Sequence, residues 1–161
     1  RPGDVFYVPA GRVHGIGAGA FVVEVQQSSD VTYRIYDYNR RDKDGKLREL
    51  HIGQAMDAIN FSDVQDDFRT EYEAVPNEPV EILTTPYFSV SLYDMTEDIT
   101  CDYSELDSFV LFVCIEGESR MVDDAQNEIT LRAGETVLFP ATTQSVNIIP
   151  EGKVKLLEAY V

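Results

Sequence analysis

The chain opens with Arg1-Pro-Gly-Asp-Val-Phe-Tyr-Val-Pro-Ala-Gly-Arg-Val-His-Gly-Ile-Gly17, a stretch that combines one short strand with two turns. Asp4–Val8 carries β-forming side chains, and Pro9 closes the strand because proline cannot donate a ladder hydrogen bond. Gly11 then allows the backbone to turn toward His14. These residues predict a strand that ends in a turn bearing a histidine, so His14 is the first residue at which we expect chemistry.

The residues after this turn continue the β pattern. Ala20–Gln27 and Val31–Tyr38 are both rich in β-forming side chains and alternate in polarity. Together with the first strand they predict a meander, which is typical of an antiparallel sheet. Gln54–Phe61 has apolar residues at helical spacing and predicts the one helix of the chain.

The second half of the chain predicts a separate domain. Residues 62–79 are polar and acidic with two prolines near the end, and we interpret them as a linker between a domain at 1–61 and another at 80–161. From residue 80 onward, short β-rich segments alternate with turn residues, a pattern typical of a sandwich or jelly roll. The expected strands are 80–84, 88–93, 108–115, 119–122, 128–131, 136–139, 145–148 and 154–161.

The opening stretch has a second copy near the end of the chain. Arg1-Pro-Gly-Asp-Val-Phe-Tyr-Val-Pro-Ala-Gly aligns with Arg132-Ala-Gly-Glu-Thr-Val-Leu-Phe-Pro-Ala-Thr, so the same turn, strand and proline stop occur twice. In the second copy Ser145 stands in the place of His14, and Thr142 replaces the glycine of the turn. We therefore expect the second copy to keep the fold and to lack a metal ligand.

Composition limits the classes of partner. The chain has 161 residues, of which 43% are hydrophobic, and its formal net charge is −16. Such a field repels nucleic acid and anionic membranes, and an anionic substrate would need a local basic group. The two cysteines lack the spacing of a metal or redox motif, and no apolar run is as long as a membrane helix. We expect a soluble, cytoplasmic protein that binds neither nucleic acid nor membrane.

The opening stretch fits the second cupin motif, G-x5-P-x-G-x2-H, with Gly3, Pro9, Gly11 and His14 in place. The run Glu24-Val-Gln-Gln-Ser-Ser-Asp-Val-Thr-Tyr-Arg34 resembles the corresponding run of type I mannose-6-phosphate isomerases of the short bacterial form. The resemblance is strong from His14 to about residue 59 and weaker elsewhere. It implies a mainly β protein of cupin jelly rolls: a partial first barrel, one short helix, and a complete, metal-free C-terminal barrel.

The resemblance also implies an activity, the interconversion of mannose 6-phosphate and fructose 6-phosphate through a cis-enediol. In that family the histidine of the motif is a zinc ligand, which corresponds to His14, and the other ligands would lie upstream of residue 1. The resemblance assigns catalytic roles to Glu24 and Arg34 and a substrate-binding role to Asp30. A carboxylate can move protons, and an arginine can stabilise the enediolate.

Other interpretations of the same residues stay open. Without the resemblance, Glu24 is interpreted as a solvent-facing carboxylate, Arg34 as a charge that protects an edge strand, and His51 as a structural residue. For function, the alternatives are a non-enzymatic cupin that binds sugar or mediates assembly, and another cupin chemistry such as a dioxygenase or sugar-nucleotide epimerase. We expect a chain that is only part of the enzyme to be inactive alone and to self-associate through exposed apolar strands.

Overall fold

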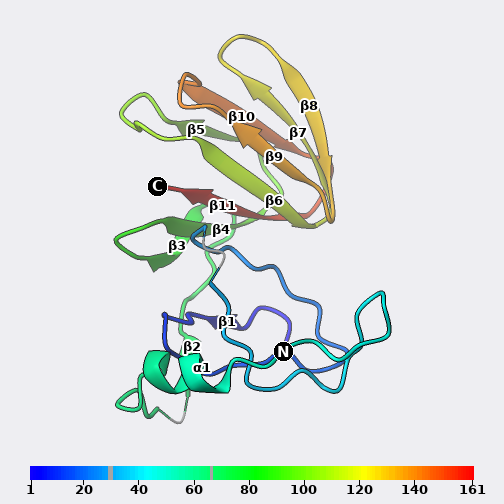
Figure 1. Cartoon of the computed structure of the whole chain (residues 1–161). Coiled ribbons are helices and arrows are strands. Elements are labelled where there is room, and N and C mark those ends of the chain that lie inside the picture. The colour runs from blue at the N-terminus through cyan, green and yellow to red at the C-terminus, as the bar shows by residue number, and fades with distance from the viewer. Residues whose placement is uncertain (29–30, 66) are drawn as a thin grey trace. The chain divides into compact units, whose positions relative to one another are not determined.

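The computed structural model describes residues 1–28, 31–65 and 67–161. The chain divides into two compact units, one formed by Phe6–Arg69 and the other by Arg1–Val5 together with Thr70–Val161. The larger unit holds the two main sheets, and the smaller unit holds the helix (Figure 1). None of the helices among the described residues is long and apolar enough to cross a bilayer.

One sheet of the larger unit has five strands in the order β3-β4-β11-β6-β9. Every neighbouring pair in this sheet is antiparallel. Its strands are β3 (Pro79–Thr84), β4 (Ser89–Met95), β11 (Val154–Tyr160), β6 (Val110–Glu116) and β9 (Thr136–Phe139). Neighbours in the sheet are mostly distant in sequence, as in a jelly roll.

The second sheet of this unit has four strands in the order β5-β10-β7-β8. Its strands are β5 (Ile99–Asp102), β10 (Ser145–Pro150), β7 (Glu118–Asp123) and β8 (Glu128–Arg132). The chain crosses repeatedly between the sheets, which form a sandwich and are not closed into one barrel (Figure 1).

Strand alternation explains the core between the sheets. In β6 the buried residues are Val110, Phe112 and Cys114, which are separated by partly exposed neighbours. The opposite sheet contributes residues such as Met121 and Ile148, both with no exposed surface. The rings of Tyr93, Phe112 and Phe139 stack edge-on or tilted, with centroids 6.1 Å apart in each successive pair. One contiguous apolar cluster therefore joins both sheets.

The strands expected from residue 80 onward are confirmed, with ends that shift by one or two residues. The structure adds β5, which the sequence analysis missed. The omission has a physical reason: β5 is only four residues long, so the alternation of Ile99 and Cys101 with polar neighbours covers too few positions to distinguish a strand from a loop. Pairing with β10 across Ile99–Asp102 forms this strand, and its own sequence gives only a weak signal.

The N-terminal strand predictions are largely wrong. The strand expected at Asp4–Val8 is reduced to β1 (Val5–Phe6), which pairs with β2 (Arg69–Thr70) in a two-stranded sheet. The described residues of Ala20–Gln27 and Val31–Tyr38 form no strand. A strand requires a neighbouring strand that forms hydrogen bonds with its backbone groups. Alternation in a sequence indicates which side chains share a face, and it does not indicate whether such a neighbour is present.

The predicted helix exists, but its bounds differ from Gln54–Phe61. Helix α1 spans Ile52–Ala58, and His51 is its N-cap residue. The His51 carbonyl accepts a hydrogen bond from the Ala55 amide at 2.8 Å, so the helix begins before the apolar pattern does. It ends at Ile59, whose backbone is extended.

Candidate functional site

His14 lies just after a tight turn. The Arg12 amide donates to the Pro9 carbonyl at 3.2 Å, and Gly11 has a φ of +86°. A Cβ at Gly11 would lie 2.9 Å from the Ala58 carbonyl oxygen, so both the backbone angle and the close approach require glycine. The turn and the C-terminal end of α1 thereby fix where the chain enters His14.

The side chain of His14 is exposed, and its Nδ1 lies 3.1 Å from the Arg12 carbonyl oxygen. Because a carbonyl can only accept, this contact assigns the proton to Nδ1. The lone pair of Nε2 is then available to a metal, an arrangement common among histidine ligands. His14 thus fits the role of a single ligand.

Arg12, which the sequence analysis did not single out, is the anchor of this turn. Its guanidinium makes a two-pronged hydrogen bond to Asp63, at 2.6 and 2.9 Å, and a third bond of 2.6 Å to the Tyr7 carbonyl. It also lies over the ring of Phe68, 4.2 Å from the centroid. The hydrogen bond from Arg12 lowers the pKa of the Asp63 carboxyl.

Arg34 is held by both its backbone and its side chain. Its amide donates to Nδ1 of His51 at 3.1 Å, and its carbonyl accepts from the His51 amide at 2.7 Å. Its Nη1 donates to the Glu49 carbonyl at 3.2 Å, and its Nε lies 3.8 Å from the Asp37 carboxylate. The Nδ1 lone pair of His51 is occupied by the Arg34 amide, and a structural role for His51 stays a prediction.

The Asp37 carboxylate is the centre of an arginine cluster. It is buried and accepts hydrogen bonds from Arg40 at 2.5 and 3.1 Å, and from Arg48 at 2.7 Å and at a second, shorter contact. The hydrogen bond from Arg48, together with Arg40, holds the pKa of Asp37 well below its usual range. We call Asp37, Arg34, Arg40 and Arg48 the arginine cluster. A signal was present in the sequence, since basic residues concentrate between residues 34 and 48.

The other predicted site residues are not joined to this cluster by any contact among the described residues. Glu24 is exposed, and Asp30 lies outside the described residues. Within the described part of the chain, no hydrogen bond or ion pair links any two of His14, Glu24 and Arg34, and no group of three or more His, Cys, Asp or Glu side chains could hold a metal ion. The convergence of these three residues stays a prediction.

The interior of the C-terminal sandwich contains a second polar group. Glu158, which is 4% exposed, accepts hydrogen bonds from Tyr93 at 3.1 Å and from Tyr103. Burial raises the pKa of Glu158, although the two hydroxyls act in the opposite direction. Glu158 is in phase with the buried Val154 and Leu156 of β11, so strand alternation alone could have placed it inside. These bonds join β11 and β4 to the segment that follows β5.

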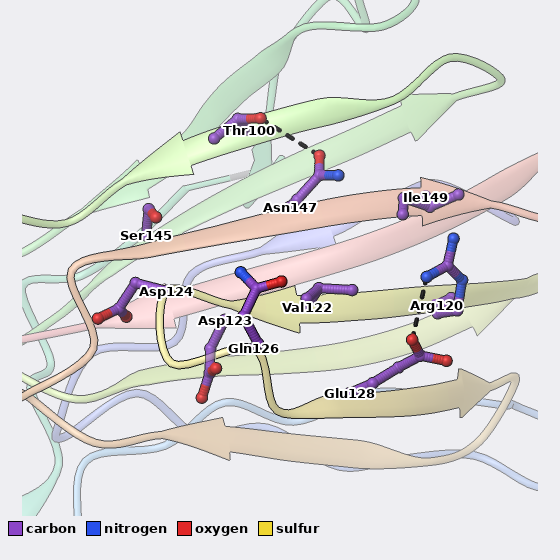
Figure 2. A pocket seen from close by; sticks show the side chains of 10 residues that line it. All are labelled: Thr100, Arg120, Val122, Asp123, Asp124, Gln126, Glu128, Ser145, Asn147 and Ile149. Carbon is purple, nitrogen blue, oxygen red and sulfur yellow. Dashed lines mark hydrogen bonds and ion pairs between the residues drawn. The ribbon is translucent and has the colours of Figure 1, made fainter.

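The outer face of the four-stranded sheet carries a shallow hollow of about 400 Å³. Figure 2 shows two of its polar pairs, each across neighbouring strands: Thr100 with Asn147 at 3.2 Å, and Arg120 with Glu128 at 3.1 Å. The hollow is lined by Thr100, Arg120, Val122, Asp123, Asp124, Gln126, Glu128, Ser145, Asn147 and Ile149. It holds none of the predicted catalytic residues, and its lining consists mainly of hydroxyl, amide and charged side chains.

Comparison with known proteins gives consistent matches. A family model described as the cupin domain of mannose-6-phosphate isomerase matches residues 80–161. Mannose-6-phosphate isomerase ManA of Bacillus subtilis is 37% identical over 145 residues, which cover 87% of this chain and 44% of the relative. Mannose-6-phosphate isomerase of Streptococcus mutans is 30% identical over 145 residues, which cover 90% of this chain and 45% of the relative.

The fold is matched as well. The crystal structure of the mannose 6-phosphate isomerase from Bacillus subtilis aligns with a TM-score of 0.66 at 27% identity, over 83% of this chain and 41% of that chain. The predicted cupin jelly-roll fold is thereby confirmed. The chain spans about half the length of the curated relatives it matches.

Proposed function

The chain belongs to the mannose-6-phosphate isomerase family, and we propose that it is part of an enzyme that interconverts D-mannose 6-phosphate and D-fructose 6-phosphate. The observation that carries this proposal is the family match over residues 80–161 together with 37% identity to the Bacillus subtilis isomerase. In this proposal residues 1–61 belong to the catalytic domain, 62–79 form a linker, and 80–161 form a metal-free domain.

His14 supplies one ligand of a zinc ion through Nε2, because Nδ1 is committed to the Arg12 carbonyl at 3.1 Å. A catalytic zinc site uses about three protein ligands, so His14 is one member of a larger set. When bound, zinc would act as a Lewis acid on the oxygens of carbon 1 and carbon 2, where negative charge develops as the proton moves between these carbons. The relatives are about twice the length of this chain, and the remaining ligands come from that additional part of the fold.

The other residues of the reaction are Glu24, Arg34 and Asp30. Glu24 moves the proton between carbon 1 and carbon 2, a task suited to an exposed carboxylate that makes no competing bond among the described residues. Arg34 stabilises the negative charge of the enediolate. His51 holds its backbone amide, and the Glu49 carbonyl accepts a hydrogen bond from its Nη1, which restricts the position of the guanidinium. Asp30 orients the sugar.

The activity is tested most sharply with a chimera that joins residues 1–161 to the N-terminal half of the Bacillus subtilis relative. We expect the chimera with zinc to form fructose 6-phosphate in a coupled assay, and the 161-residue chain alone to be inactive. Arg34→Lys in the chimera should lower kcat about 100-fold, because a point charge cannot replace the fork of donors. Robust turnover by the 161 residues alone would contradict the proposal that the remaining zinc ligands lie outside this chain.

Zinc binding is tested separately from turnover. His14→Asn should abolish zinc retention by the chimera, whereas His51→Asn, which alters the only other histidine, should leave it intact. A folded chimera that retains zinc after His14→Asn would remove His14 from the metal site. A chimera that binds zinc through His14 and does not isomerise the sugar would contradict the proposed reaction.

We also propose that the 161-residue chain self-associates. Large apolar side chains of residues 6–38 are unusually exposed, among them Phe21 at 82%, Val31 at 62% and Tyr36 at 61%. Such surface favours a partner strand from a second copy. Sedimentation velocity at micromolar concentration should detect dimers or larger species, and Phe21→Ser should reduce them; a stable monomer would contradict the proposal.

The cytoplasm is the proposed location, because Cys101 and Cys114 are both free and buried.

A second candidate function is sugar binding without catalysis, which the polar hollow beside Asn147 favours. Titration of the chain with mannose, followed by NMR, tests it: shifts confined to residues of the hollow would support it.

A further inference from the structure

Positive charge is concentrated in one short segment of an acidic chain. Residues 34–48 contain six of the 13 basic residues and three of the 29 acidic ones, which gives the segment a formal charge of +3 in a chain of −16. The basic residues are Arg34, Arg40, Arg41, Lys43, Lys46 and Arg48. An anion that approaches this chain is repelled by most of its surface, so this segment is the place where it would be attracted.

The arginine cluster fixes the direction of three of these charges. One buried carboxylate, Asp37, is shared by Arg40 and Arg48 through hydrogen bonds and lies 3.8 Å from Nε of Arg34. Three guanidinium groups around one carboxylate leave two positive charges uncompensated. Asp37 therefore holds the arginines in position without neutralising them.

Each guanidinium of the cluster keeps donors for a further acceptor. Arg40 and Arg48 both use Nε and Nη2 on Asp37, and among the described residues the Nη1 group of each makes no hydrogen bond. The Arg40 side chain is 62% exposed and that of Arg48 is 38% exposed. Arginine forks with donors open to solvent match the tetrahedral oxygens of a phosphate group.

A small hollow of about 60 Å³ has Arg40 and Arg48 among its lining residues. It is lined by Tyr36, Asp37, Asn39, Arg40, Leu47, Arg48 and Leu50. The Asp42 carboxylate, within the same segment, accepts hydrogen bonds from the amides of Asp44 and Lys46, both at 2.9 Å. It closes the turn that carries the basic residues and keeps residues 40–48 in a hairpin-like loop.

We propose that Arg40 and Arg48, positioned by Asp37, form an anion site that takes the phosphate group of a phosphomonoester, with Arg34 beside it. The identification of that ester as the sugar phosphate rests on the proposed function. Within that reaction the site holds the end of the substrate that does not react, while Arg34 is left to face the reacting oxygens. Arg40 and Arg48 then contribute to substrate affinity and not to the chemical step.

The test uses the 161-residue chain and three probes: inorganic phosphate, mannose 6-phosphate and mannose. We expect phosphate and mannose 6-phosphate to bind with a Kd in the millimolar range or tighter and to shift the NMR signals of residues 34–48. Mannose should not shift these signals. Arg40→Gln should weaken phosphate binding at least about tenfold, because it removes a positive charge and the charge-assisted Nη1 donor, and Arg40→Lys should recover only part of the loss.

Arg132→Gln is the matched control, because it makes the same change in net charge on an exposed ion pair, 3.1 Å from Glu118, in the C-terminal unit. It should leave phosphate binding unchanged. Equal weakening of phosphate binding by Arg40→Gln and Arg132→Gln would mean that the affinity depends only on net charge, and it would contradict the proposed site. Absence of phosphate binding by the folded chain would contradict it as well. If the chimera does not isomerise the sugar but the chain still binds phosphate, the anion site stands and only the identification of its ligand as the sugar phosphate is contradicted. Failure of the proposed function and failure of the site are therefore distinguishable.

Discussion

The two copies of the opening motif have the same turns and different surroundings. In the first copy the Asp4 amide donates to the Arg1 carbonyl at 3.0 Å, and in the second the Glu135 amide donates to the Arg132 carbonyl at 2.9 Å. The glycines of these turns, Gly3 and Gly134, have φ values of +89° and +87°. Short-range sequence is therefore sufficient to specify the turn, wherever the copy lies.

The turns at the far ends of the two copies match as well. The Arg12 amide donates to the Pro9 carbonyl at 3.2 Å, and the Thr143 amide donates to the Pro140 carbonyl at 2.9 Å. Between the turns the copies differ, since β9 spans Thr136–Phe139 and β1 spans only Val5–Phe6. β9 pairs with β6, an inner strand of the five-stranded sheet, whereas β1 pairs with the two-residue β2. The length of a strand is thus decided by its neighbour and not by its own residues.

The largest expected difference between the copies is in burial. Phe139 is 7% exposed and packs edge-on against Phe112, whereas its counterpart Val8 is 40% exposed. Phe139→Ala should lower the free energy of unfolding by about 3–5 kcal/mol, and Val8→Ala by less than about 0.5 kcal/mol. Urea denaturation of both variants measures this. Similar losses would mean that the first copy is packed as firmly as the second.

This contrast explains how much of the fold the sequence could predict. The C-terminal strands were predicted well because β-rich segments alternate there with turn residues and each segment pairs with a neighbouring strand in the fold, as β6 and β11 do. The strands expected at Ala20–Gln27 and Val31–Tyr38 carry the same kind of pattern, and no strand forms in the described part of these ranges. A local pattern contains no information about whether a partner is present.

The candidate site follows the same division. His14 was predictable because a short motif of glycines and a proline places it after a turn, and its geometry is local. Of the arginine cluster only Arg34 was predicted. The other members were missed, although they lie within fifteen residues of it, because the burial of Asp37 is a property of the folded loop. Glu158 was missed because its charge favours an outward-facing position, although its phase with Val154 and Leu156 in β11 places it inside, where Tyr93 and Tyr103 donate hydrogen bonds to it.

A smaller effect is expected at the glycines of the shared turn. Gly134→Ala should lower the stability of the C-terminal domain by about 1–2 kcal/mol, because a side chain at positive φ is strained even where no atom lies within 4 Å of the new Cβ. Gly3→Ala introduces the same strain at φ +89° but should alter only local hydrogen exchange around β1, which is two residues long. Differential scanning calorimetry of the two variants provides the comparison. Equal shifts in Tm would indicate that both turns belong to one cooperative unit.

The smallest expected effect is on pH dependence, and its sign should differ between the regions. Burial raises the pKa of Glu158, so its contribution to stability is fully present below the pKa of an unfolded glutamate and is lost as pH rises through the folded pKa. Asp63 is the reverse: the hydrogen bond from Arg12 lowers its pKa, so its contribution is present above the unfolded pKa and is lost as pH falls through the folded pKa. Region-resolved hydrogen exchange across an acid-to-neutral series should therefore show that acidification favours the sandwich and disfavours the turn around Arg12. Glu158→Gln should reduce the pH dependence of the sandwich alone, and Asp63→Asn should reduce that of the turn around Arg12 alone. The same pH dependence in both regions would mean that neither carboxyl determines the stability of its own surroundings.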